Sequence, residues 1–207
     1  MKKIVIIGAN DFQNQLILKA KEMGFETHVF AWKDGSVGER TADYFYPISI
    51  KETDQIVEKC REICPDAVAS IASDLANITV SKVASALGLP CNSQECIRIS
   101  TNKYAMREAF TKARIATPRF YRVDRMEAYL YGLKLPVVVK PTDRSGSRAI
   151  TKVTDFKDLE KAIRDAVAQS FENQAIVEEY IEGEEYSYET ISFRGKHTNL
   201  AITKKYT

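Results

Sequence analysis

The sequence predicts an α/β fold in which a parallel βαβ sheet wrapped by helices precedes an α+β unit with antiparallel strands. Aliphatic strand-like runs alternate with helical periodicity from residue 3 to residue 87, which is typical of a parallel sheet. An extended segment at 115–118, ending in Thr117-Pro118, then breaks the pattern. Beyond it, strands and helices come in pairs that favour antiparallel neighbours. We therefore expect a first domain over 1–93, a helical linker over 94–116 and a second domain over 117–207.

In the first domain, each predicted strand is followed by a helix or a loop. The expected strands cover 3–7, 26–32, 44–48 and 67–71. The expected helices cover 11–23, 51–64 and 74–87, and a loop is expected over 33–40. Gly24 and Pro65 are stop signals after the first two helices. This order predicts a sheet whose strand ends open onto one crevice.

The linker and the second domain follow a different order. Two short helices are expected in the linker, over 93–99 and 101–113. The expected strands beyond it cover 119–122, 135–139, 148–153, 174–179, 185–193 and 198–203. Two helices are expected between them, over 124–131 and 155–168.

The charge and composition exclude several functions. Lys and Arg number 30 against 28 Asp and Glu, a formal charge of +2, which is too near neutral for a nucleic-acid or anionic-membrane partner. The apolar run after the first two lysines is too short for a signal peptide, so we expect a cytoplasmic protein. The cysteines form no CxxC pair and are expected to be reduced, packed thiols; they are Cys60, Cys64, Cys91 and Cys96.

The stretch 135–148 is the strongest candidate for ligand binding. Lys140 stands at the exit of an apolar strand, and Pro141 stops the strand because it has no N–H to donate. A small polar loop over 142–147 follows. A fixed lysine beside exposed backbone N–H groups is a good receptor for phosphate oxygens. An ordinary hairpin with a surface lysine explains this stretch, taken alone, equally well.

The turn after the first strand does not fit a dinucleotide-binding site. Asn10 and Gln13 occupy positions where the dinucleotide fingerprint that begins at Gly8 has glycines, so close approach of a pyrophosphate is disfavoured. The crevice remains a candidate substrate site, with polar residues Asn10, Asp11, Ser73, Asp74 and Asn77. For Ser73 and its neighbours, an ordinary helix N-cap with an acidic first turn is the favoured explanation.

Three further features lie outside these stretches. Lys103 begins a predicted helix, where a basic residue opposes the macrodipole and is not explained by helix stability. In the stretch 175–183, a buried strand runs into a polar hinge that contains Gly183, and the backbone groups freed there suit a purine edge. Glu185 follows, and a carboxylate suits ribose hydroxyls. The acidic residues over 178–189, taken alone, are better explained as a solvated edge that deters strand pairing.

Taken in order, these motifs resemble the ATP-grasp superfamily, which includes carbamoyl-phosphate synthase, biotin carboxylase and D-alanine–D-alanine ligase. The resemblance rests on segments 102–104, 117–118, 136–141, 145–147 and 177–185. The preceding α/β domain is similar to the Rossmann-like pre-ATP-grasp domain of that superfamily. The resemblance covers essentially the whole chain.

The resemblance implies a set of nucleotide-binding residues. Two lysines would contact the α- and β-phosphates of ATP, namely Lys103 and Lys140. A flap would close over the phosphates and contains Ser145, Gly146 and Ser147. The adenine and ribose would be held by four residues, Glu178, Glu179, Ile181 and Glu185. Ala149 stands where a glycine is common, which implies a stiffer flap.

The resemblance also implies a reaction: ATP activates a carboxylate as an acylphosphate, which an amine or thiol then attacks. Small-molecule carboxylate and amine substrates, ATP and Mg²⁺ are implied, with the metal ligands expected beyond Thr207. We therefore expect a truncated or split enzyme that binds nucleotide weakly and is inactive alone, and a homo-oligomer through the first domain is an open expectation. The alternatives are a non-catalytic nucleotide-binding module, one chain of a two-chain enzyme, or an NAD-dependent oxidoreductase.

Overall fold

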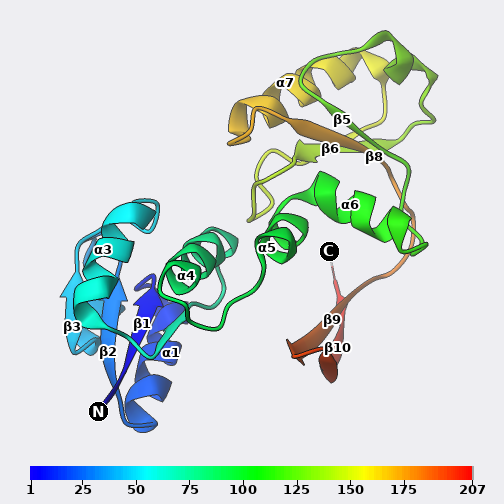
Figure 1. Cartoon of the computed structure of the whole chain (residues 1–207). Helices are drawn as coiled ribbons and strands as arrows, with labels where there is room; N and C mark the ends of the chain where they lie inside the picture. The colour runs from blue at the N-terminus through cyan, green and yellow to red at the C-terminus, as the bar shows by residue number, and fades with distance from the viewer. Residues whose placement is uncertain (207) are drawn as a thin grey trace.

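A computed structural model of the chain describes residues 1–206, in which two four-stranded sheets are joined by a pair of helices (Figure 1). The first sheet is parallel and the second antiparallel, as the sequence predicts. Within the described residues, no helix is long and apolar enough to cross a membrane.

The first sheet has the order β3-β2-β1-β4. Its strands are β1 (Lys2–Ile7), β2 (Phe25–Phe30), β3 (Tyr44–Tyr46) and β4 (Ala67–Ala69). Its helices are α1 (Asp11–Glu22), α2 (Val37–Thr41), α3 (Thr53–Ile63) and α4 (Asp74–Ala86). Alternate residues of β1 supply two apolar clusters: Val5 and Ile7 pack with α3 and α4, while Ile4 and Ile6 pack with α1. The sheet is therefore covered on both faces, as a parallel sheet requires.

The short helix α2 lies where the sequence predicts only a loop. Gly38 explains its position, because its N–H donates to the Ala9 carbonyl at 2.9 Å and a Cβ there would lie 2.7 Å from that oxygen. Only glycine allows this close approach of the two backbones.

Two helices connect the sheets, α5 (Gln94–Thr101) and α6 (Lys103–Lys112). Ser93 caps α5 by accepting the Cys96 N–H, and Asn102 caps α6 by accepting the Ala105 N–H. The break between the helices is therefore at Asn102, close to the position that the sequence indicates.

The second sheet has the order β5-β8-β6-β7. Its strands are β5 (Phe120–Val123), β6 (Val137–Pro141), β7 (Thr151–Val153) and β8 (Ala175–Glu179). Helix α7 (Leu159–Gln169) covers one face, and α6 lies on the other side of the sheet (Figure 1). Valines from the central strands, including Val137, Val139 and Val177, pack with Leu159 and Ile163 of α7 in one buried cluster.

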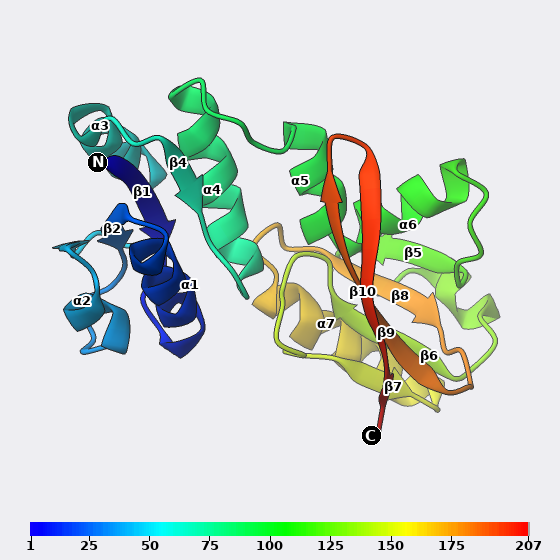
Figure 2. The ribbon, with the colours of Figure 1, turned by 90° about the horizontal axis from the view of Figure 1, so that it is seen from below.

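A hairpin of β9 (Glu185–Phe193) and β10 (Lys196–Lys205) forms a separate two-stranded sheet. It lies on the α6 side of the second sheet and passes in front of β6 and β8 when seen from below (Figure 2). All residues of both strands are exposed, apolar side chains such as Ile191, Phe193 and Ile202 included.

Three further local predictions are wrong. The helix expected over 124–131 is a 3₁₀ turn, η1 (Ala128–Gly132), and the strand expected over 148–153 is confined to β7 because 146–149 form turns. A second 3₁₀ turn, η2 (Phe156–Asp158), precedes α7. All four cysteines are free, but only Cys60 is buried, so the expected packing is wrong for the other three.

Candidate functional site

The α6 face of the second sheet carries charged side chains. Because side chains alternate along a strand, Val137 and Val139 face α7 while Lys140 faces α6. On β8, Val177 faces α7 and Glu178 faces α6. Val138 and Glu178 are register partners, so Lys140 and Glu178 are diagonal neighbours on one face, within reach of long side chains.

Glu178 lies between two cations from different elements. Its Oε2 atom is 2.6 Å from Nζ of Lys140, and its Oε1 atom is 2.8 Å from Nε of Arg107 on α6. A second guanidinium nitrogen of Arg107 donates to Oε2 at 3.4 Å. The Glu178 side chain is 4% exposed, whereas those of Lys140 and Arg107 are 17% and 23% exposed.

The pKa of Glu178 lies below its ordinary value. Burial raises the pKa of this carboxyl, but the hydrogen bonds from Arg107 and then Lys140, together with their charges, outweigh burial. Glu178 is therefore an anion at neutral pH despite its burial.

Lys103 stands at the start of α6 and reaches the loop after β6. Its backbone N–H donates to the Thr142 carbonyl at 2.7 Å, and its ammonium donates to the Arg144 carbonyl. Burial lowers the pKa of Lys103, and the Lys140 ammonium lowers it further. The structure therefore brings together the two lysines that the sequence singled out, from segments 37 positions apart.

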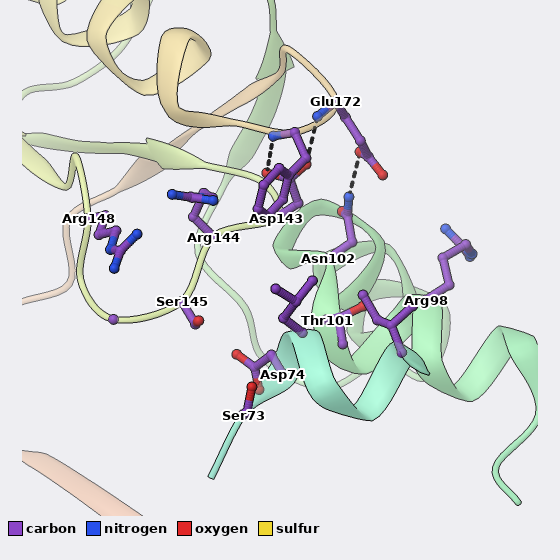
Figure 3. Close-up of a pocket in the computed structure, with 14 residues that line it drawn as sticks. Ser73, Asp74, Arg98, Thr101, Asn102, Asp143, Arg144, Ser145, Arg148 and Glu172 are labelled. Atoms are coloured by element: carbon purple, nitrogen blue, oxygen red, sulfur yellow. Dashed lines mark hydrogen bonds between the residues drawn. The ribbon is translucent and has the colours of Figure 1, made fainter. Parts of the chain in front are cut away.

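The loop after β6 borders a cavity of about 490 Å³, which also touches α4, α5 and the segment before β8 (Figure 3). Ser145 and Gly146 line it, whereas Ser147 does not. Gly146, Ser147 and Ala149 have φ of 72°, 54° and 50°, a left-handed conformation that costs side-chain-bearing residues free energy.

The base of this loop is tied down by side chains. The carboxylate of Asp143 accepts the backbone N–H groups of Phe171 and Glu172 at 3.1 and 2.8 Å (Figure 3). The amide of Asn102 donates to the Glu172 carboxylate at 2.9 Å, and the Arg144 guanidinium stacks on the Phe171 ring with its carbon 4.3 Å from the ring centre. The base of the loop is therefore held by side-chain contacts, whereas residues 145–148 are exposed.

The five crevice candidates are only partly brought together. Asn10 and Ser73 cap α1 and α4 and line a common cavity of about 150 Å³ beside Gly8. Asp74 lines the larger cavity, on the side facing Ser145 (Figure 3). Asp11 and Asn77 are exposed and line neither cavity.

The adenine and ribose candidates are divided between strand and hinge. The N–H of Glu179 already donates to the Arg119 carbonyl at 2.9 Å. Ile181 and Glu185 line a cavity of about 510 Å³ at the hinge before β9, where the Glu185 carboxylate accepts a bond from Lys205 at 2.8 Å. Glu178 lies apart from this cavity, on the α6 face.

Comparison with known proteins identifies the family of this chain. The sequence model of the ATP-grasp domain family matches residues 100–207, slightly more than half of the chain. The chain belongs to the ATP-grasp family.

The relatives support this assignment. A 3-methyl-D-ornithine–L-lysine ligase from Methanosarcina barkeri is 27% identical over 208 residues, covering 99% of this chain and 51% of that protein. An L-amino acid ligase from Bacillus licheniformis has the same fold, with a TM-score of 0.83 at 24% identity, over 99% of this chain and 50% of that chain. The chain therefore spans about half the length of these ATP-grasp relatives.

A second solved structure with this fold holds a nucleotide. The biotin carboxylase domain of 2-oxoglutarate carboxylase from Hydrogenobacter thermophilus was solved with MgADP, ADP and bicarbonate. It matches 98% of this chain and 50% of its own chain, with a TM-score of 0.79 at 18% identity, which shows a shared fold. Within residues 1–206, no group of three or more His, Cys, Asp or Glu side chains is placed to hold a metal ion.

Arg107 belongs to the charged cluster around Glu178, and the sequence patterns did not single it out. It lies four residues after Lys103, one helical turn on, and so shares a helix face with it. That spacing was available in the sequence. Its pairing with Glu178, 71 positions away, was not.

Proposed function

We propose that this chain is the ATP-binding portion of an ATP-dependent carboxylate–amine or carboxylate–thiol ligase that acts through an acylphosphate. The observation that carries the proposal is the convergence of Lys103 and Lys140 on the α6 face of the second sheet, beside a small polar loop. The ligase names of relatives in the same family support it.

The two ammonium groups would hold the phosphates of ATP. Each lysine is partly buried, so its charge acts through less water than a surface lysine would. The pKa of Lys103 is lowered in part because Lys140 repels it, and an oxyanion placed between the two would relieve that repulsion. Phosphoryl transfer depends on such positioned cations where charge develops.

The loop over 145–148 would supply backbone N–H donors and exclude water. Its exposure and its lack of apolar anchors make it the part of the site that changes position at least cost. We propose that Glu178, with backbone groups of Glu179 and Ile181, holds adenine and that Glu185 holds the ribose after leaving Lys205. These residues would bind and position the nucleotide, and Mg²⁺ bound with ATP would take several of its ligands from phosphate oxygens and water.

The proposal extends to small-molecule carboxylate and amine substrates and to a cytoplasmic protein, with self-association through the first domain. The carboxylate would lie near Asn10, Ser73 and Asp74, at the crevice beside the loop cavity. The carboxyl ends of parallel strands are where such folds bind ligands.

Isothermal titration with ATP tests the proposal. The Lys140→Ala chain is expected to bind ATP roughly tenfold more weakly than the wild type, the loss of one charge-assisted contact. Lys161→Ala is the matched control, because Lys161 is an exposed lysine on α7, on the other face of the sheet, and its removal should leave affinity unchanged. Equal ATP affinity of wild type and Lys140→Ala would remove the basis of the proposal.

A further inference from the structure

The Glu178 carboxylate has more cationic partners than its charge requires. Lys140 contacts one of its oxygens, and the guanidinium of Arg107 reaches both. A single cation would neutralise the charge, and burying a second one next to it costs free energy of desolvation. The second partner therefore needs an explanation beyond charge balance.

The two partners also belong to different parts of the proposed mechanism. Lys140 is proposed to contact the phosphates of ATP, and its ammonium is bonded to Glu178 at 2.6 Å. To turn toward a phosphate it must loosen that bond. A carboxylate that is 4% exposed would then have lost a partner in a poorly hydrated place.

We propose that Arg107 is a positioning residue that keeps the Glu178 carboxylate paired while Lys140 turns to the phosphates. The inference rests on the proposed function, since it assigns Arg107 a part in nucleotide binding at that site. Arg107 touches Glu178 and acts on the phosphates only through Lys140.

Arginine suits this task for three reasons. Its planar fork already reaches both oxygens of Glu178, so no rearrangement is needed when Lys140 leaves. It carries its charge at every pH at which proteins are folded, so the pair does not depend on a proton. It stands on α6, one turn from Lys103, and therefore stays in place when the loop after β6 moves.

Without Arg107, Glu178 and the phosphates would compete for Lys140. The free energy of breaking the Lys140–Glu178 pair would be subtracted from the binding of any polyphosphate. Removing the charge of Glu178 as well would end the competition. The inference therefore predicts that a second substitution repairs the first, which a merely structural role for Arg107 does not.

A four-protein titration with inorganic tripolyphosphate tests this prediction without involving adenine. The proteins are the wild type, Arg107→Met, Glu178→Gln and the double variant. Arg107→Met is expected to bind tripolyphosphate roughly tenfold more weakly than wild type, the equivalent of one charge-assisted hydrogen bond. The double variant is expected to return to within about threefold of Glu178→Gln. Arg164→Met, which removes an exposed arginine on α7, should match the wild type.

The outcomes separate the inference from the proposed function. If the wild type binds neither tripolyphosphate nor ATP, the proposed function fails. If the wild type binds and Arg107→Met binds equally well, or the double variant is as weak as Arg107→Met, the inference is overturned while the function stands. Should Arg107→Met fail to fold by circular dichroism, Arg107→Lys replaces it, because lysine keeps the charge but loses the two-oxygen fork; weaker binding repaired by Glu178→Gln is again the expected result.

Discussion

The two faces of the second sheet differ although the same strands form both. On the α7 face, Val137, Val139 and Val177 are at most 2% exposed and pack with Leu159 and Ile163. On the α6 face, the same strands present Lys140 and Glu178, joined by Lys103 and Arg107 from the helix. One face is an apolar core, and the other is a charged surface with a neutralising carboxylate at its centre.

The difference shows how one strand can serve both stability and binding. Alternation along β6 assigns odd positions to the core and even positions to the site, so the core fixes where Lys140 lies. A register slip of one residue would exchange the two faces, which makes the alternative pairing costly. The apolar face therefore holds the charged face in position, and charges can gather there without having to stabilise the fold.

Substitution of a buried valine on β6 is expected to give the largest loss of unfolding free energy, and a neighbouring valine provides the control. Val139 is 0% exposed on the α7 face, and Val138 is half-buried on the α6 face. Val139→Ala should cost about 2–3 kcal/mol of unfolding free energy, from the lost methyl groups and the cavity left behind. Val138→Ala, the matched control, should cost about 1 kcal/mol or less because its surroundings can relax. Urea denaturation at constant slope measures both.

Equal losses of unfolding free energy for Val139→Ala and Val138→Ala would contradict the difference between the two faces. They would mean that the α6 face is packed as tightly as the α7 face. Tripolyphosphate titration adds a second readout. The Val139 variant, where folded, should bind as the wild type does, since no charge on the α6 face has changed.

Removing the charge of Glu178, at the centre of the charged face, should lower the free energy of unfolding by a smaller amount that depends on pH. At pH 7, Glu178→Gln should cost about 1–2 kcal/mol, because Arg107 and Lys140 lose charged hydrogen bonds. The pKa of Glu178 is lowered in the folded chain, so its contribution is full above the unfolded value of about 4.5 and is lost as pH falls through the folded pKa. The difference between variant and wild type should therefore shrink below pH 4.5.

Urea denaturation from pH 7 down to the lowest pH at which both proteins fold measures this effect, because urea is uncharged and does not screen the ion pairs. A difference that stays constant with pH would mean that Glu178 stabilises the fold through packing rather than charge. The charged groups that face Glu178 are Arg107, Lys140 and Lys103.

Much of the fold was predictable because it depends on local periodicity. The hairpin strand β9 has the predicted bounds, and both sheets have the predicted strand directions. The helix expected over 124–131 failed for a tertiary reason. Tyr129 and Tyr131 lie against Tyr121 and Phe156, and Leu130 between them is fully buried, an arrangement that local periodicity does not contain.

The site was predictable in part for the same reason. Lys103 and Lys140 follow local signals, a helix start and a strand end, and the fold brings them together. Glu178 was singled out as a ligand for adenine, but its pairing with Arg107 joins α6 to β8 and has no local signature. Local patterns therefore indicate individual residues of the charged face, but they do not indicate contacts between distant segments.

Lys103 should give the smallest effect on stability. Burial and the Lys140 ammonium lower the pKa of Lys103, so its positive charge opposes folding. Its bond to the Arg144 carbonyl acts in the opposite direction. Lys103→Met should therefore change unfolding free energy by no more than about 0.5 kcal/mol in urea, while tripolyphosphate affinity falls roughly tenfold.

Lys112→Met, an exposed change on the same helix, should alter neither the unfolding free energy nor the tripolyphosphate affinity. A loss of unfolding free energy above about 1.5 kcal/mol for Lys103→Met would mean that its ammonium mainly anchors the loop. The charged face would then contribute to the stability of the fold as the apolar face does.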